Sequence, residues 1–249
     1  MMRKKRGYKR ETPQELVRDY RLFAIVCEGS QREPGYFSLF QYLSPRIAVD
    51  IIEEKVNSSE LEARKSKKSA PRWLVDRAML YIEKEGLHED DSLWFVMDID
   101  RWPTEQLHEI SQHCAEHPNW HVVLSNPCFE VWLCYHQLAG LAGLNATSSQ
   151  EFKTLLDKLD KGGYHPLKYI PLIKSAISNA KAMDSNPESD FPEFKETKVY
   201  QLGESLLTVA GINAYDDFIR NTIPELIKNH NKKTQIKATQ RKIYRKKKE

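Results

Sequence analysis

"FAIVCEGSQREP", residues 23–34, is an apolar run that ends abruptly in Cys27-Glu28-Gly29. A short, continuous apolar run bounded by turn residues is typical of a strand that is buried on both faces of a sheet. The run therefore predicts a buried strand over 21–27, with the carboxylate of Glu28 at its carboxyl end. The position of Glu28 is the first indication of a functional site.

The chain continues as an alternation of helix and strand patterns up to about residue 140. Apolar residues at helical spacing predict helices over 34–43, 71–84, 103–117 and 129–138. Short apolar runs predict three further strands over 48–52, 92–97 and 120–124. Such an alternation is typical of an α/β fold, here with a mainly parallel four-stranded sheet flanked by helices.

The remaining residues read as helices joined by polar loops. Helix patterns cover 152–159, 170–183, 199–210 and 215–228, and polar loops are expected over 57–70 and 185–197. We therefore predict a basic N-terminal arm over 1–19, an α/β core over 20–140, a helical appendage packed on the core over 141–229, and a basic tail over 230–249. The tail also fits a basic helix.

The composition fits a chain that buries a sizeable core. It has 249 residues, of which 40% are hydrophobic, and no run approaches the roughly 18 apolar residues of a membrane span. No apolar segment follows the charged start, so we expect neither a secretory signal nor a membrane anchor, and a cytoplasmic location. The four cysteines show no C-x-x-C spacing and are expected to be buried thiols.

The formal charge of +3 hides an uneven distribution. Residues 1–10 carry six Lys or Arg and no acid, and residues 228–249 carry ten Lys or Arg and one acid, so 11–227 carries −12. One interpretation is that both ends neutralise phosphates of a nucleic acid, DNA or RNA. The other is that they are solvated ends that keep the protein in solution.

Carboxylates follow two of the predicted strands at the edge where open α/β sheets bind ligands. Glu28 follows the first strand, and Asp98 and Asp100 follow the strand over 92–97. In an extended chain, residues two apart leave the same face, so the two aspartates are expected to share one cation while Ile99 turns toward the core. Hard oxygen ligands favour Mg²⁺ or Mn²⁺. The alternative is a polar strand end without a ligand.

Three segments resemble the RloB family of bacterial defence-associated proteins, whose core looks like a Toprim domain, a Rossmannoid fold. They are "VCEGSQREPGYF" (26–37), "FVMDIDR" (95–101) and "SNPCFEVWL" (125–133). The resemblance implies that Glu28 is a general acid/base or a metal ligand and that Asp98 and Asp100 hold the metal. In the family the residues after Glu-Gly are x-x-Thr-Glu-Pro, whereas Arg32 stands at the Thr position here.

Further side chains are candidates for the same crevice. Glu130 either completes the metal site or only favours the dipole of its helix, and Arg101 either neutralises a scissile phosphate or pairs with Asp98. Asn126 either caps the end of the strand over 120–124 or is a ligand of the site. Lys181 is left open, and His165 is expected to be an exposed loop histidine.

These groups suit phosphoryl transfer, and the resemblance implies a metal-dependent nuclease of the Toprim type. Its substrate is DNA or RNA, with tRNA among the candidates. No G-x-x-x-x-G-K-[ST] loop occurs, so the chain is not expected to be a P-loop ATPase itself. The resemblance implies an effector of anti-phage defence that acts with a separate ATPase, and a homo-oligomer is a further possibility. The alternatives are a non-catalytic nucleic-acid-binding module with a structural cation, and a topoisomerase- or primase-type enzyme, of which a topoisomerase would need a nucleophilic tyrosine presented by a further domain.

Overall fold

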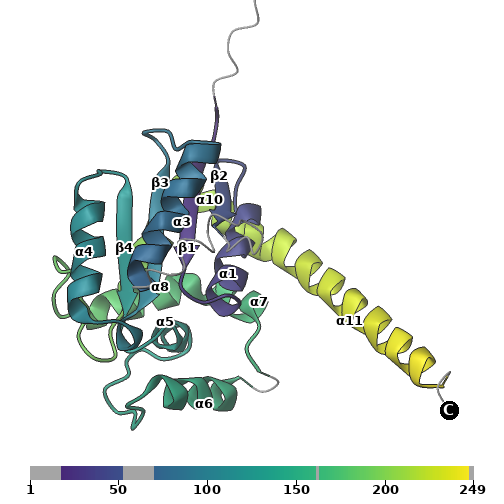
Figure 1. The fold of residues 1–249 in the computed structure, drawn as a ribbon. Coiled ribbons are helices and arrows are strands. Elements are labelled where there is room, and N and C mark those ends of the chain that lie inside the picture. Colours follow the sequence, from purple (N-terminus) through teal and green to yellow (C-terminus); the bar gives the residue numbers. More distant parts are fainter. Residues whose placement is uncertain (1–17, 53–69, 161–162, 247–249) are drawn as a thin grey trace, which may run out of the picture.

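The computed structural model describes residues 18–52, 70–160 and 163–246. Its sheet consists of β1 (Arg21–Cys27), β2 (Ile47–Ile51), β3 (Ser92–Asp98) and β4 (Trp120–Ser125). The strands are all parallel and lie in the order β2-β1-β3-β4 (Figure 1). All four predicted strands and the α/β fold are thereby confirmed. β1 and β3 are the two central strands, so their carboxyl ends lie side by side.

Helices cover both faces of the sheet (Figure 1). Alternate residues of β1 point to opposite faces, with Phe23 and Ile25 on one and Ala24 and Val26 on the other. The second face packs against α3 (Ala70–Glu85) and α4 (Thr104–Ala115). The apolar cluster on the first face includes residues of α1 (Arg32–Phe37), α5 (Glu130–Tyr135), α8 (Ile173–Met183) and α9 (Val199–Ala210).

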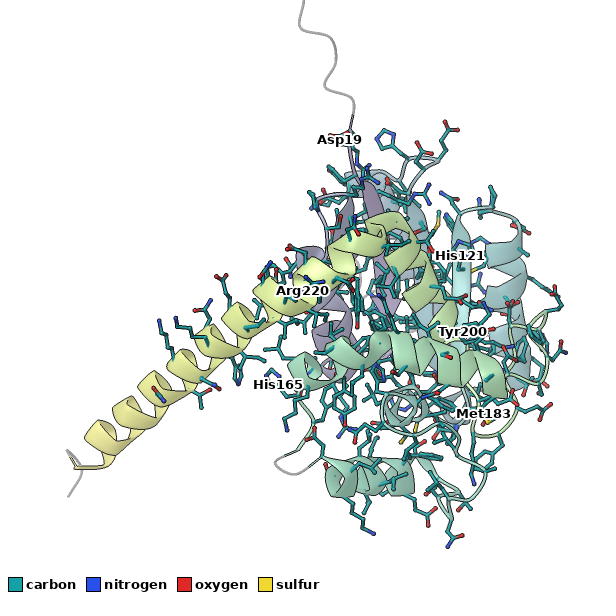
Figure 2. All side chains as sticks on the ribbon, turned by 180° about the vertical axis from the view of Figure 1, so that it is seen from behind. Asp19, His121, His165, Met183, Tyr200 and Arg220 are labelled. Atoms are coloured by element: carbon teal, nitrogen blue, oxygen red, sulfur yellow. The ribbon has the colours of Figure 1, made fainter. Side chains whose placement is uncertain are left out.

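Shorter and peripheral elements complete the fold. Three 3₁₀ turns lie at Ser38–Tyr42, Ile99–Arg101 and Ile170–Leu172, and two further helices are α6 (Ser149–Leu159) and α7 (Pro166–Tyr169). The elements near the end of the chain are α10 (Ile212–Asp217), a π turn at Phe218–Thr222 and α11 (Ile223–Lys246). α11 projects from the body, so the prediction of a helical tail is confirmed (Figures 1 and 2).

Several predicted boundaries were wrong. The predicted helix over 34–43 begins two residues earlier and changes to a 3₁₀ turn at Ser38, and the predicted helix over 170–183 begins with a 3₁₀ turn. The predicted loop over 57–70 lies outside the described residues except for Ala70, where α3 begins. The helices after residue 140 share one apolar cluster with the sheet, while the proposed boundary at 140 stays a prediction.

The predicted polar loop over 185–197 ends in a short antiparallel pairing with β4. The backbone N–H of Lys198 donates to the Leu124 carbonyl at 2.8 Å, and Ser125 forms a bridge with Thr197. The Lys198 ammonium is fully buried and lies 2.6 Å from Oδ1 of Asp184, which is likewise inaccessible to solvent. Because breaking such a buried pair leaves an uncompensated charge, this contact fixes the segment against the sheet.

The four cysteines are free thiols and all are buried, which confirms the prediction made for them. Within the described ranges no helix combines the length and the apolar character that crossing a membrane requires.

His136 directly follows α5 as its C-cap, is buried and is held by two polar contacts. Its Nδ1 lies 3.0 Å from the Trp132 carbonyl, which only accepts, so Nδ1 carries the hydrogen and Nε2 accepts from the Tyr36 hydroxyl at 2.9 Å. Burial lowers the pKa of His136 to about 3. The folded protein therefore keeps His136 neutral at pH values where the unfolded chain binds a proton.

This difference predicts a loss of stability in acid. The pKa of His136 is lower in the folded than in the unfolded protein. Its contribution to stability is therefore fully present above about pH 6.5 and is lost as the pH falls toward 3. Between pH 7 and pH 5 the loss from this residue is about 2 kcal/mol of unfolding free energy. Urea denaturation at pH 7 and pH 5 measures the unfolding free energy, which should decrease less in His136→Gln than in the wild type, by this amount. An equal decrease in both proteins would contradict the assignment.

Candidate functional site

Glu28 joins the carboxyl ends of the two central strands. Its Oε2 accepts from the backbone N–H of Asp98 at 3.1 Å and from Nε1 of Trp102 at 2.9 Å. Its Oε1 accepts from Nη1 of Arg101 at 3.0 Å. Arg101 therefore pairs with Glu28 and makes no hydrogen bond to Asp98, contrary to one of its two predicted roles. The contribution of Trp102 was not foreseen from the sequence.

Asp98 and Asp100 do not lie on one face of an extended strand, so that part of the prediction was wrong. The chain turns into a 3₁₀ helix at Ile99–Arg101, while Ile99 packs toward the core as expected. Oδ1 of Asp98 accepts from the backbone N–H of Phe129 at 2.8 Å, and the side chain is 8% exposed. Asp100 is exposed and accepts a hydrogen bond from Ser149 of α6.

Glu33 is a fourth carboxylate of the site that the sequence analysis did not single out. Its carboxylate lies directly against Gly29, so closely that a Cβ at that position would overlap it. The absence of a side chain at Gly29 thus leaves room for the Glu33 carboxylate beside the end of β1. The signal available in the sequence was the Glu33-Pro34 pair, which opens the helix after the turn.

Glu130 is brought into the same cluster by the start of α5. Its side chain is 5% exposed and forms an ion pair with Nη1 of Arg32. The Arg32 guanidinium also lies 5.8 Å from the centre of the Tyr164 ring. Arg32 therefore supplies a positive charge to this cluster.

The crowding of these carboxylates determines their electrostatics. Burial raises the pKa of Asp98 well above its ordinary value, and the charges of Glu28, Glu33, Glu130 and Asp100 raise it further. Burial is also the main cause that raises the pKa of Glu33, with Glu130 and Glu28 adding to it. Negative charge is thus held close together at the ends of β1 and β3, where a cation would relieve the repulsion.

The model of the RloB-like protein family matches residues 23–206. The chain belongs to this family. Neither a search of curated proteins nor a search of solved structures found a significant match. The matched region of this RloB-like protein includes Glu28, Glu33, Asp98, Asp100 and Glu130. Both strongly basic ends of the chain, 1–10 and 228–249, lie outside it.

The donor set of the RloB-like protein suits a hard divalent cation, although it is not arranged around one point. The described ranges contain no group of three His, Cys, Asp or Glu side chains placed to hold a metal. Among these residues, Oδ2 of Asp98 accepts no hydrogen bond and Glu33 has no ion-pair partner. Carboxylate oxygens beside like charges are the donors that Mg²⁺ or Mn²⁺ prefers, so the chemistry of this donor set fits such a cation, and Asp98 and Glu33 are the residues that would hold it.

Three residues considered from the sequence do not join this RloB-like site. Asn126 donates through Nδ2 to the Pro192 carbonyl at 3.0 Å and so anchors the loop. Lys181 pairs with Glu204 at 2.7 Å on the exposed side of α8 and α9. His165 caps α7 and packs against the ring of His230 at the base of α11 (Figure 2).

Proposed function

We propose that this RloB-like protein is a metal-dependent nuclease of the Toprim type that cleaves phosphodiester bonds with Mg²⁺ or Mn²⁺. The observation that carries the proposal is the cluster of carboxylates at the ends of β1 and β3, in which burial and neighbouring charges raise the pKa values of Asp98 and Glu33. Perturbed carboxyl groups at this edge of a parallel sheet are typical of a catalytic site.

The side chains divide into two roles. Asp98 and Glu33 would hold the cation, with Asp100 and Glu130 beside them, and the bound cation would polarise a phosphate and lower the pKa of a water molecule. Glu28 orients Arg101, whose side chain is 52% exposed and so is free to meet a phosphate. The resemblance implies that Glu28 is a general acid/base or a metal ligand, and both roles stay predictions. In the structure both of its oxygens already accept N–H groups.

The family also suggests a biological setting. Resemblance to RloB proteins supports an effector of anti-phage defence that acts in the cytoplasm beside a separate ATPase. This setting rests on the resemblance, whereas the nuclease activity rests on the chemistry of the site.

A second candidate function is a nucleic-acid-binding module without catalysis. It is favoured by the concentration of Lys and Arg at the two ends of the chain, which can neutralise phosphates without any catalytic site. Of the tyrosines beyond the α/β core that a topoisomerase would use, Tyr169 and Tyr200 are buried, as is Tyr135, and Tyr164 contacts Arg32, so none of these four is placed as an exposed nucleophile.

The activity is tested directly with the purified full-length chain. Single- and double-stranded DNA, total RNA and tRNA are incubated with Mg²⁺, Mn²⁺ or EDTA, with and without the candidate ATPase, and the cleaved ends are sequenced. Cleavage that requires the cation supports the nuclease. Binding of nucleic acid without cleavage under every condition supports the binding module instead.

The basic tail gives a separate prediction. Removing residues 230–249 deletes the C-terminal part of α11 and nine Lys or Arg residues, so binding should weaken by at least about tenfold at low salt. The slope of log K against log salt concentration should flatten by about 0.9 for each phosphate that the shortened chain no longer neutralises. Fluorescence anisotropy at several salt concentrations measures both quantities. Lys158→Gln on α6 serves as a control, and an unchanged slope in the truncated protein would contradict a role for the tail.

A further inference from the structure

Arg32 lies between the carboxylate cluster and solvent. It is the first residue of α1, four positions after Glu28, and its Nη1 pairs with Oε1 of Glu130. The Glu130 side chain is 5% exposed, whereas that of Arg32 is 33% exposed. The arginine therefore covers a buried carboxylate on one side and reaches solvent on the other.

The described contacts leave most of the guanidinium available. Arginine has five N–H donors in a planar fork, and within the described ranges only Nη1 of Arg32 donates a hydrogen bond. The Tyr164 hydroxyl donates to the backbone carbonyl of Arg32 at 3.4 Å, which holds the backbone at Arg32, while its side chain is 33% exposed and reaches solvent. A fork of this kind matches the oxygens of a phosphate.

Glu130 has two rival partners in this site. A buried carboxylate needs a positive charge, and Arg32 supplies one in the absence of a divalent cation. The same oxygens are hard ligands beside Asp98 and Glu33, so a cation bound there competes with the guanidinium.

We propose, resting on the nuclease function above, that Arg32 exchanges partners between Glu130 and the substrate. Without a cation it neutralises Glu130; when a divalent cation takes over this carboxylate, the released guanidinium binds a phosphate group of the nucleic-acid backbone. Cation and nucleic acid then favour each other's binding, and this coupling is reciprocal.

The test compares the wild type, Arg32→Met and the control Arg46→Met, whose exposed arginine precedes β2 at the opposite edge of the sheet. Titration calorimetry measures Mn²⁺ affinity of the full chain. Without the competing guanidinium, Arg32→Met should bind Mn²⁺ at least about tenfold more tightly. In Mn²⁺ the same variant should bind fluorescent DNA and RNA duplexes at least about fivefold more weakly, while Arg46→Met should keep the Mn²⁺ affinity of the wild type.

The outcomes separate this proposal from the nuclease itself. If the wild type binds Mn²⁺ and Arg32→Met binds it with equal or lower affinity, the exchange of partners is overturned. The proposed nuclease function is not affected by that result. No Mn²⁺ binding by the wild type would overturn both. If Arg32 only holds Glu130 in position for the cation, Arg32→Met should bind Mn²⁺ more weakly than the wild type.

A second variant keeps the proposal testable if Arg32→Met does not fold. Glu130→Gln removes the charge that holds Arg32, so nucleic-acid binding in EDTA should become at least about fivefold tighter than that of the wild type. The control Asp157→Asn changes the net charge by the same amount on an exposed face of α6. Equal effects of the two variants would overturn the proposal.

Discussion

Cleavage of nucleic acid is expected to fall by about 100-fold or more when Glu28 is replaced by glutamine. In the structure both carboxylate oxygens of Glu28 accept N–H groups, from the Asp98 backbone, Trp102 and Arg101. Glutamine offers one oxygen and turns an NH₂ group toward the remaining donors, and it leaves Arg101 without its charged partner. The exposed guanidinium then loses the orientation that the proposed reaction requires.

The measurement is the single-turnover rate of cleavage in Mn²⁺, together with the shift in melting temperature that Mn²⁺ causes. Glu28→Gln should keep most of this shift because Glu28 is not expected to be the main ligand. The exposed Glu105 of α4 provides a matched control, Glu105→Gln, which should cleave as the wild type does. If the Mn²⁺ shift disappears with activity, Glu28 is itself a ligand; if cleavage persists, the carboxylate is not catalytic.

Asp98→Asn is expected to have opposite effects with and without a cation. Asparagine keeps an oxygen to accept from the Phe129 backbone N–H, so the hydrogen bond survives while the charge is removed. Without a cation, repulsion from the neighbouring carboxylates disappears and the variant should melt at least about 2 °C higher, since 1 kcal/mol corresponds to roughly 2–4 °C in a chain of this size. With Mn²⁺ the wild type should gain stability by mass action and the variant should not.

Differential scanning fluorimetry in EDTA and in a Mn²⁺ series measures both effects. Asp157→Asn removes an equal charge from an exposed site and should follow the wild type in both solutions. A lower melting temperature of Asp98→Asn in EDTA would show that its charge is compensated in the folded protein. A retained Mn²⁺ shift would place the cation elsewhere.

The strands could be predicted because their signal is local. The run over 92–97 is apolar at nearly every position, which burial on both faces explains, and β3 is buried along its whole length. Helix boundaries were less accurate because tertiary contacts decide where a helix ends. The helix predicted over 215–228 is interrupted by a π turn at Phe218–Thr222 and then continues to Lys246 as α11.

The site could be predicted only in part. Glu28 and Asp98 follow from their strands, because the carboxyl ends of neighbouring parallel strands meet. The hydrogen-bond and ion-pair partners of the site residues could not be predicted from the sequence. The pairing of Arg32 with Glu130 joins residues 98 positions apart, and no local pattern specifies such a contact.

The sequence by itself determined the parallel α/β sheet, the acidic residues at its carboxyl edge and the basic ends of the chain, since apolar runs, turn residues and charges are properties of short segments. The tertiary structure decided which acids come together and what neutralises them. Asp100 lies beyond the end of β3 because the chain turns into a 3₁₀ helix at Ile99, and the Glu33 carboxylate lies in the space that the missing side chain of Gly29 leaves. Burial and the distances between charges depend on the packing of segments far apart in the sequence, and these quantities set the pKa values of Asp98 and Glu33.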